Sequence, residues 1–142
     1  MRETLRISAR ADYAIRATAA IAAIPDDDLV TADSLSVSQG IPLRFLLAIL
    51  NNLRHAGIVE SRRGPGGGYR LLRAADTLTL AEVIAAVDIT PHPQPWSQPE
   101  PGECATTAHV HALWSSLRRS VHDALEHTTI ADVLAGNQLR LS

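Results

Sequence analysis

A glycine-rich segment from Arg62 to Arg70 constrains the fold of this 142-residue chain more than any other feature. It reads Arg-Arg-Gly-Pro-Gly-Gly-Gly-Tyr-Arg, in which the glycines reach backbone conformations closed to other residues and Pro65 presets one dihedral angle of a turn. Short runs of strand-forming residues flank it at 58–61 and 69–72. The segment therefore predicts a tight β-hairpin with arginines at and around its tip.

Helices are predicted before this hairpin. The first covers about 8–24, and the second begins near Thr31, whose hydroxyl can cap free amides, and stops near Gly40. The third begins with Pro42 in its first turn, where the missing N–H costs nothing, and ends at Gly57. Its core face is predicted from residues at helical spacing: Leu46, Ile49, Leu50 and Leu53. Helix, helix and basic hairpin in this order are the layout of a winged helix, so the fold class is mainly α with a small β-hairpin wing.

The charge is distributed unevenly along the chain. Residues 1–73 carry a formal charge of +3 and residues 74–142 carry −5, and residues 41–73 hold six arginines against one acid. Every cation is arginine, which makes forked contacts to phosphate and guanine that lysine cannot reproduce, although base composition of the genome gives the same bias. A basic hairpin of this kind lies along a phosphate backbone or probes a minor groove. We therefore expect double-stranded DNA as a partner.

Composition excludes several other classes of protein. No apolar run reaches the ~20 residues that a membrane span needs, and the first ten residues lack the apolar block of a signal peptide. A single cysteine, Cys104, excludes an internal disulfide framework. The glycines at 64–68 precede a strand and do not open a helix, so they are not a phosphate-binding loop of an enzyme. We expect a cytoplasmic protein without catalytic activity.

The second half of the chain divides at a proline-rich segment. A further helix begins at Thr79 with a capping-box pattern and runs to about Val87. Residues 90–102 then hold five of the eight prolines, which predicts an irregular loop. The predicted organisation is a DNA-binding domain over 1–88, a loop resembling a sensor over 89–104, and a dimerisation helix with a C-terminal helix over 105–142.

The long helix predicted over 105–127 has little domain to pack against. One stripe of this helix gives the expected dimerisation residues, which are Leu113, Trp114, Leu117, Val121 and Leu125. A dimer also matches a palindromic operator with half-sites about 34 Å apart. The alternative is that the helix folds back on its own domain.

These motifs together resemble the Rrf-two family of bacterial transcription regulators. The resemblance extends over nearly the whole chain apart from the proline-rich loop, and the wing motif is a specific signal. The matching segments are 11–16, 40–54, 56–59, 63–69, 81–84 and 129–133. The resemblance implies a dimer with its recognition helices in adjacent major grooves and its wings over the minor groove. Our hypothesis is a homodimeric, sequence-specific regulator that acts as a repressor.

The resemblance also implies which residues contact DNA. Base-reading positions fall on Pro42, Arg44, Phe45 and Leu47, and the wing positions are Arg63, Gly64, Pro65 and Gly66. We add Gln39 to the DNA-contacting residues, and we expect phosphate or minor-groove contacts from Arg10, Arg54, Arg62 and Arg63. Leu47 departs from a well-known member of the family, which carries an acid there that discriminates between operators. Since leucine can pack on a thymine methyl but cannot accept from cytosine, the operator should differ.

Sensors of this family hold an iron–sulfur cluster with three cysteines in the loop region, and this chain has one. A mixed-ligand [2Fe–2S] cluster is an alternative, because the resemblance places Asp12 at an acidic ligand position and soft thiolate and imidazole donors lie near the loop. The candidate ligands are Cys104, Asp12, His109 and His111. Otherwise the two histidines are polar residues of the dimer helix, and Asp12 pairs with Arg16 four residues on.

Two further interpretations concern the signal. Cys104 at a helix start is either a low-pKa redox switch or, as we favour slightly, a small buried side chain. A small molecule or a partner protein is a third kind of effector, with Trp96 and Trp114 as walls of a pocket, although aromatic residues more often belong to a core or an interface. A winged helix used purely for protein interaction, without specific DNA binding, is the remaining alternative function.

Overall fold

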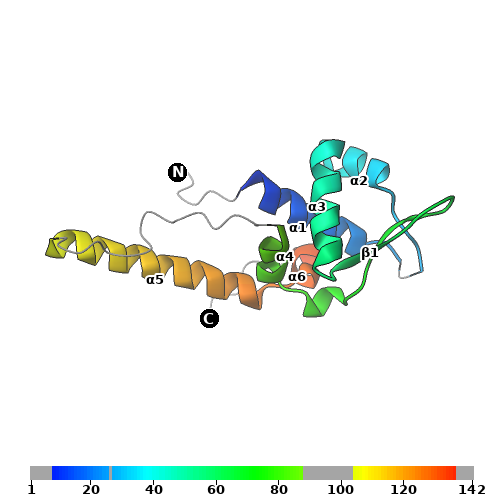
Figure 1. Ribbon diagram of the computed structural model, residues 1–142. Coiled ribbons are helices and arrows are strands. Elements are labelled where there is room, and N and C mark those ends of the chain that lie inside the picture. Colours follow the sequence, from blue (N-terminus) through cyan, green and yellow to red (C-terminus); the bar gives the residue numbers. More distant parts are fainter. Residues whose placement is uncertain (1–7, 26, 88–103, 137–142) are drawn as a thin grey trace.

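The computed structural model of the chain describes residues 8–25, 27–87 and 104–136. Helix α1 (Ala9–Ala22) lies at the centre and contacts α3 (Leu43–His55), α4 (Leu80–Val87) and α6 (Ile130–Ala135), as Figure 1 shows. Small side chains let these helices approach α1 closely, because its fully buried positions are Ala14, Ala17 and Thr18. The predicted first helix is therefore confirmed, and it forms the centre of the core.

Helices α2 (Ala32–Gln39) and α3 form the predicted helix-turn-helix. The Thr31 hydroxyl accepts from the Ser34 amide at 3.1 Å, and Gly40 ends α2 in the left-handed conformation at φ 63°. Pro42 directly precedes the first residue of α3 and does not lie within its first turn, which is a one-residue correction. The predicted core face of α3 is confirmed, since each of its members is at most 2% exposed: Leu46, Ile49, Leu50 and Leu53.

The wing is an antiparallel hairpin of β1 (Val59–Arg62) and β2 (Gly68–Leu71), one residue out of step with the predicted strands. Val30 forms an isolated β-bridge with β2, because its amide donates to the Tyr69 carbonyl at 3.1 Å and its carbonyl accepts from the Tyr69 amide at 2.7 Å. A Cβ at position 68 would lie 2.6 Å from the Val30 carbonyl oxygen. Glycine is needed there because the backbone of the wing lies directly against the segment before α2.

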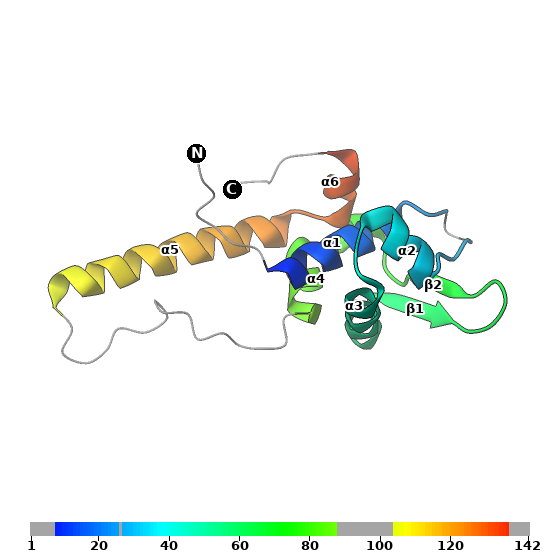
Figure 2. The same ribbon diagram turned by 90° about the horizontal axis from the view of Figure 1, so that it is seen from above.

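Helix α5 (Ala105–His127) projects from this assembly as a long arm (Figures 1 and 2). Its last turns pack against α4, and a pair of backbone hydrogen bonds of 2.9 Å joins the start of α4 to the start of α6. These bonds run from the Leu80 amide to the Thr128 carbonyl and from the Ile130 amide to the Leu78 carbonyl. The start of α4 is thus hydrogen-bonded to the segment that links α5 to α6.

The arm is amphipathic but scarcely buried. Ala124 is its one buried residue, and its apolar side chains lie open in the single chain. The exposed fractions reach 43% for Val110, 64% for Leu113, 43% for Trp114 and 42% for Leu117. Among the helices that the structure describes, none is both long and apolar enough to cross a membrane. The proline-rich loop predicted at 90–102 lies outside the described residues.

Candidate nucleic-acid interface

The outer face of α3 carries the predicted base-reading residues. Its inner face is fixed in the core, so the side chains between the buried positions must point away from the domain. Phe45 is 51% exposed and Leu47 is 45% exposed, and Arg44 and Pro42 are exposed as well. The Arg44 guanidinium lies over the Phe45 ring, 5.6 Å from its centre, which holds an arginine and an aromatic ring together at the start of α3.

The arginines of the wing region fall into two groups. Arg70 donates to Glu60, the residue opposite it across the hairpin, and Arg73 donates to Glu82 at 3.0 Å. The second group makes no ion pair with any residue that the structure describes: Arg54, Arg62 and Arg63. Two of the arginines of this region, Arg70 and Arg73, are therefore neutralised within the fold. The arginines without a carboxylate partner lie on α3, on β1 and directly after β1.

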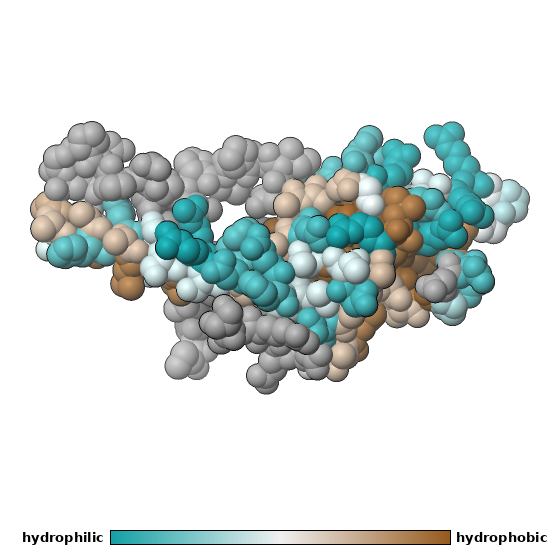
Figure 3. Space-filling view, turned by 90° about the horizontal axis from the view of Figure 1, so that it is seen from below, coloured by the Kyte–Doolittle hydropathy of each residue, from teal (hydrophilic) through white to brown (hydrophobic). Residues whose placement is uncertain are grey.

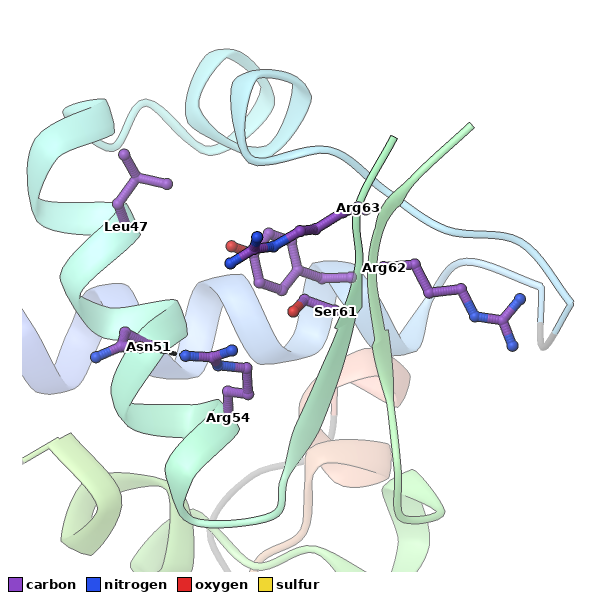
Figure 4. A pocket seen from close by; sticks show the side chains of 8 residues that line it. Leu47, Asn51, Arg54, Ser61, Arg62 and Arg63 are labelled. Atoms are coloured by element: carbon purple, nitrogen blue, oxygen red, sulfur yellow. Dashed lines mark hydrogen bonds between the residues drawn. The ribbon is translucent and has the colours of Figure 1, made fainter. Parts of the chain in front are cut away.

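A groove of about 280 Å³ separates α3 from the wing (Figure 4). Its lining brings together residues from both elements: Leu47, Asn51, Arg54, Ser61, Arg62, Arg63, Gly68 and Tyr69. Four of them are residues that sequence reasoning assigned to DNA contacts on separate elements. In Figure 3, hydrophilic side chains surround a hydrophobic area at this end of the molecule, and α5 shows apolar and polar groups side by side.

The hairpin presents alternate residues to opposite sides, as a strand must. Val59 is buried against the core, so Ser61 shares its side of β1. Arg63 follows β1, and Figure 4 shows its guanidinium on the same side, toward α3. Arg62 borders the groove, but Figure 4 shows its guanidinium pointing to the other side of the hairpin. Arg54, Arg62 and Arg63, three of the four arginines predicted to contact phosphates or the minor groove, therefore lie on two surfaces.

Other predicted DNA-contacting residues have partners inside the chain. Arg10 donates to the Val87 carbonyl at 3.4 Å, joining the start of α1 to the last turn of α4. Gln39 is half-buried, and its backbone carbonyl accepts from the guanidinium of Arg16 at 2.9 Å. At the tip of the wing, residues 64–66 are exposed.

The candidate metal ligands do not converge within the chain. Asp12 forms the i, i+4 ion pair with Arg16, at 3.2 Å. His109 is exposed and His111 is half-buried on α5. Among the residues that the structure describes, no group of three or more histidine, cysteine or carboxylate side chains is placed to hold a metal ion. Within the described part of a single chain, the four candidate ligands therefore do not form a cluster site.

Cys104 precedes the first turn of α5, and its side chain is exposed in the isolated chain, so the slightly favoured expectation of a buried cysteine is wrong here. Its Sγ lies 3.2 Å from the Thr107 hydroxyl. That side-chain hydrogen bond is the main cause that lowers the pKa of the Cys104 thiol from its usual 9.0, and backbone amides of the first turn add to the effect.

The predicted dimerisation residues separate along α5. Leu113, Trp114 and Leu117 are exposed, Val121 is half-buried, and Leu125 packs partly against the core of its own domain. The open apolar face therefore lies on the half of the arm that leaves the domain. Trp96, the second candidate pocket wall, lies outside the described residues.

Sequence reasoning missed several residues that shape this interface. Asn51 lines the groove, and its side-chain oxygen accepts from the Arg54 guanidinium at 2.9 Å. The i, i+3 spacing of Asn51 and Arg54 on one helix was the available signal. Tyr69 lies opposite Ser61 in the hairpin register, but nothing in the sequence indicated that it would also pair with Val30.

Comparison with known sequences finds one family over nearly the whole chain. Residues 7–136 match the profile of the Rrf2 family, described as "Iron-dependent Transcriptional regulator". A protein of Mycobacterium tuberculosis named as the HTH-type transcriptional regulator Rv1287 is 39% identical over 140 residues, covering 93% of this chain and 83% of that protein. The HTH-type transcriptional regulator IscR of Vibrio vulnificus is 32% identical over 135 residues, covering 95% and 80%.

Comparison with solved structures gives the same fold. CymR, titled the global cysteine regulator of B. subtilis, superposes with a TM-score of 0.79 at 24% identity, covering 95% of this chain and all of CymR. IscR of T. potens superposes with a TM-score of 0.75 at 25% identity, covering 94% of this chain and 88% of that one. The predicted winged-helix fold is confirmed by these similarities.

Proposed function

The chain belongs to the Rrf2 family and is a DNA-binding transcriptional regulator, not an enzyme, and we propose that it acts as a homodimeric repressor on a palindromic operator in the cytoplasm. In this proposal the outer face of α3 enters a major groove and the wing lies over the adjacent minor groove. Arg44, Phe45 and Leu47 read bases, while Arg54, Arg62 and Arg63 contact phosphates or the minor groove.

The observation that carries the proposal is the sorting of the arginines. The fold neutralises Arg70 and Arg73 with carboxylates but leaves Arg54 and Arg63 facing one groove beside the recognition helix. Uncompensated arginines on adjacent elements repel one another, so their placement is explained by an anionic ligand that spans both elements.

The dimer in this proposal rests on α5. The exposed side chains of Leu113, Trp114 and Leu117 cost free energy in water, and a second copy of the same helix removes them from solvent. A two-fold dimer also places two recognition helices on one side of a duplex. A signal acts on such a dimer by binding its active and inactive arrangements with different affinity, so that the spacing of the two recognition helices shifts.

The test is DNA binding as a function of salt. The full chain is mixed with fluorescent genomic fragments, and the dissociation constant is measured from about 50 to 200 mM salt by anisotropy. Phosphate contacts predict a steep loss of affinity, with a slope of about −0.9 for each contact. Arg63→Ala should weaken binding at every salt concentration. A flat salt response would instead favour the alternative that the winged helix binds a protein.

The family description and the IscR relatives favour a second candidate, a [2Fe–2S] redox sensor. The ligands in question are Cys104, Asp12, His109 and His111, which do not form a site within one chain. Iron and sulfide analysis after anaerobic purification tests this candidate. A regulator controlled by a small molecule or a protein should contain neither iron nor inorganic sulfide. Two irons and two sulfides per cluster, with visible absorption bands, would establish the sensor.

A further inference from the structure

The groove between α3 and the wing has the chemistry of a binding site for one oxyanion. Three of its eight lining residues are arginines, none of the eight is acidic, and asparagine, serine and tyrosine side chains supply neutral polar groups. Leu47 closes the end nearest the base-reading positions. Such a lining matches a group that carries negative charge on several acceptor oxygens.

Arg54 and Arg63 approach this groove from opposite walls. Arg54 extends from the last turn of α3, and Arg63 follows β1, with its guanidinium turned toward the helix (Figure 4). Arg62 points the other way, so it does not share this ligand. A ligand held by both arginines would join the recognition helix to the wing.

Asn51 determines how Arg54 is presented. Its Oδ1 accepts from one terminal nitrogen of the Arg54 guanidinium at 2.9 Å, one helical turn away. An exposed arginine otherwise samples many rotamers, and fixing it costs conformational entropy at the moment of binding. A neutral acceptor fixes the guanidinium while leaving its charge and its remaining N–H groups available.

We propose that this groove seats a single phosphate of the DNA backbone, gripped jointly by Arg54 and Arg63, and that Asn51 is the positioning residue that holds Arg54 in place for it. The inference rests on the proposed function and goes further, because it assigns one shared phosphate to both elements. That phosphate fixes the angle between recognition helix and wing on the duplex, and thereby the base pairs that α3 reaches.

The test pairs protein variants with DNA in which single phosphates are neutralised. The probe is a duplex selected by the protein from a random library, remade with one methylphosphonate at each position in turn. Wild-type protein should lose about tenfold in affinity at one phosphate in each half-site. Arg54→Ala and Arg63→Ala should each lose a similar factor on the unmodified duplex, and each should be less sensitive than wild type to neutralisation of that same phosphate, because one arginine still contacts it. The double variant should be insensitive to it.

The role of Asn51 is tested by the charge of its replacement. Asn51→Ala should weaken binding roughly threefold, and Asn51→Asp should weaken it more, because a carboxylate beside Arg54 competes with the phosphate. Asn52→Ala on the same helix is the matched control, since Asn52 does not line the groove, and thermal melting verifies that every variant is folded. A residue that merely supports the helix would not distinguish alanine from aspartate in this way.

The possible outcomes separate this inference from the proposed function. If Arg54→Ala and Arg63→Ala change the sensitivity to neutralisation of the same phosphate, the shared phosphate is supported. If they change the sensitivity at two different phosphates, the shared phosphate is overturned and the proposed DNA binding is unaffected. Equal affinities of the Asn51 variants and wild type overturn the positioning role. If the library yields no duplex that binds in a salt-dependent manner, the proposed function itself fails.

Discussion

The recognition helix α3 and the arm α5 are both amphipathic, yet they are stabilised in different ways. Four of the 13 residues of α3 are buried in the core of its own chain, whereas one of the 23 residues of α5 is. Helical propensity alone is marginal in water, so most of the stability of a helix comes from packing its apolar face. The difference indicates that α3 is stabilised by packing within its own chain. Helix α5 needs further burial of its apolar face, which in our proposal a second copy of the chain supplies.

The largest effect is expected when charged residues are introduced on the exposed apolar face of α5. Leu113→Asp together with Leu117→Asp should convert the proposed dimer into a monomer of 15.3 kDa, half the mass of the dimer. The reason is that a carboxylate cannot be buried unpaired in an apolar interface. Loss of the second DNA-binding unit should weaken operator affinity about a hundredfold. Light scattering after size exclusion gives the mass, and anisotropy gives the affinity.

Leu134→Asp is the matched control, since Leu134 is 46% exposed and belongs to α6, not to the arm. An unchanged mass in the double variant of α5 would contradict the assignment of this face to the dimer.

Truncation in the core of α3 should act on stability. Leu50 is fully buried, so Leu50→Ala should lower the free energy of unfolding by about 2–5 kcal/mol. Leu134→Ala, at an exposed position, should change it by no more than about 0.5 kcal/mol. Urea unfolding followed by circular dichroism measures both, and similar losses for the two variants would remove the distinction drawn between core and surface.

Acid should weaken the attachment of α4 to the wing region. The hydrogen bond from Arg73 is the largest effect that lowers the pKa of the Glu82 carboxyl from 4.5, and the Thr79 amide adds to it. A lowered pKa in the folded state means that this stabilisation is complete above the ordinary value and is lost as pH falls through the folded value. Glu82→Gln should therefore cost about 0.5–1 kcal/mol near pH 6, and the difference from wild type should shrink as the pH falls below 4.5 through the lowered pKa of Glu82.

Urea unfolding of both proteins at several pH values measures this difference. A gap between them that stays constant down to pH 3 would show that the Glu82 charge is not its source.

The smallest expected effect lies at the start of α5. Because the Thr107 hydroxyl lowers the pKa of the Cys104 thiol, alkylation of Cys104 should reach half its limiting rate below pH 9.0. Thr107→Val should move that midpoint upward, and Thr106→Val, which keeps its backbone amide, should not. The rate of reaction with iodoacetamide as a function of pH measures it, and identical midpoints in the three proteins would be the contrary result.

Local patterns were sufficient to predict much of this molecule. The Thr31 cap, the buried spacing along α3 and the glycine-rich turn follow from nearest neighbours in the sequence, and all three are confirmed. Partners that lie far apart in the chain could not be predicted in this way. Two examples depend on tertiary contacts: the pairing of Val30 with Tyr69, and the hydrogen bond from the Arg10 guanidinium to the Val87 carbonyl.

The candidate interface divides along the same line. The basic character of the 41–73 region was apparent from composition, but the neutralisation of Arg70 by Glu60 required the hairpin register. Strand alternation further separates Arg62 from Arg63, which are adjacent in sequence. Individual arginines could be assigned to a surface once the strand boundaries, one residue from those predicted, were known.

The most direct test of the central claim, a homodimer that presents two winged helices to DNA, is selection of bound duplexes from a random library by the full chain. A symmetric dimer should select an inverted repeat whose half-sites are centred about 34 Å apart, or a multiple of that spacing, because the symmetry of the dimer must match that of its site. Enrichment of a single asymmetric half-site, or of no sequence above the starting library, would contradict it.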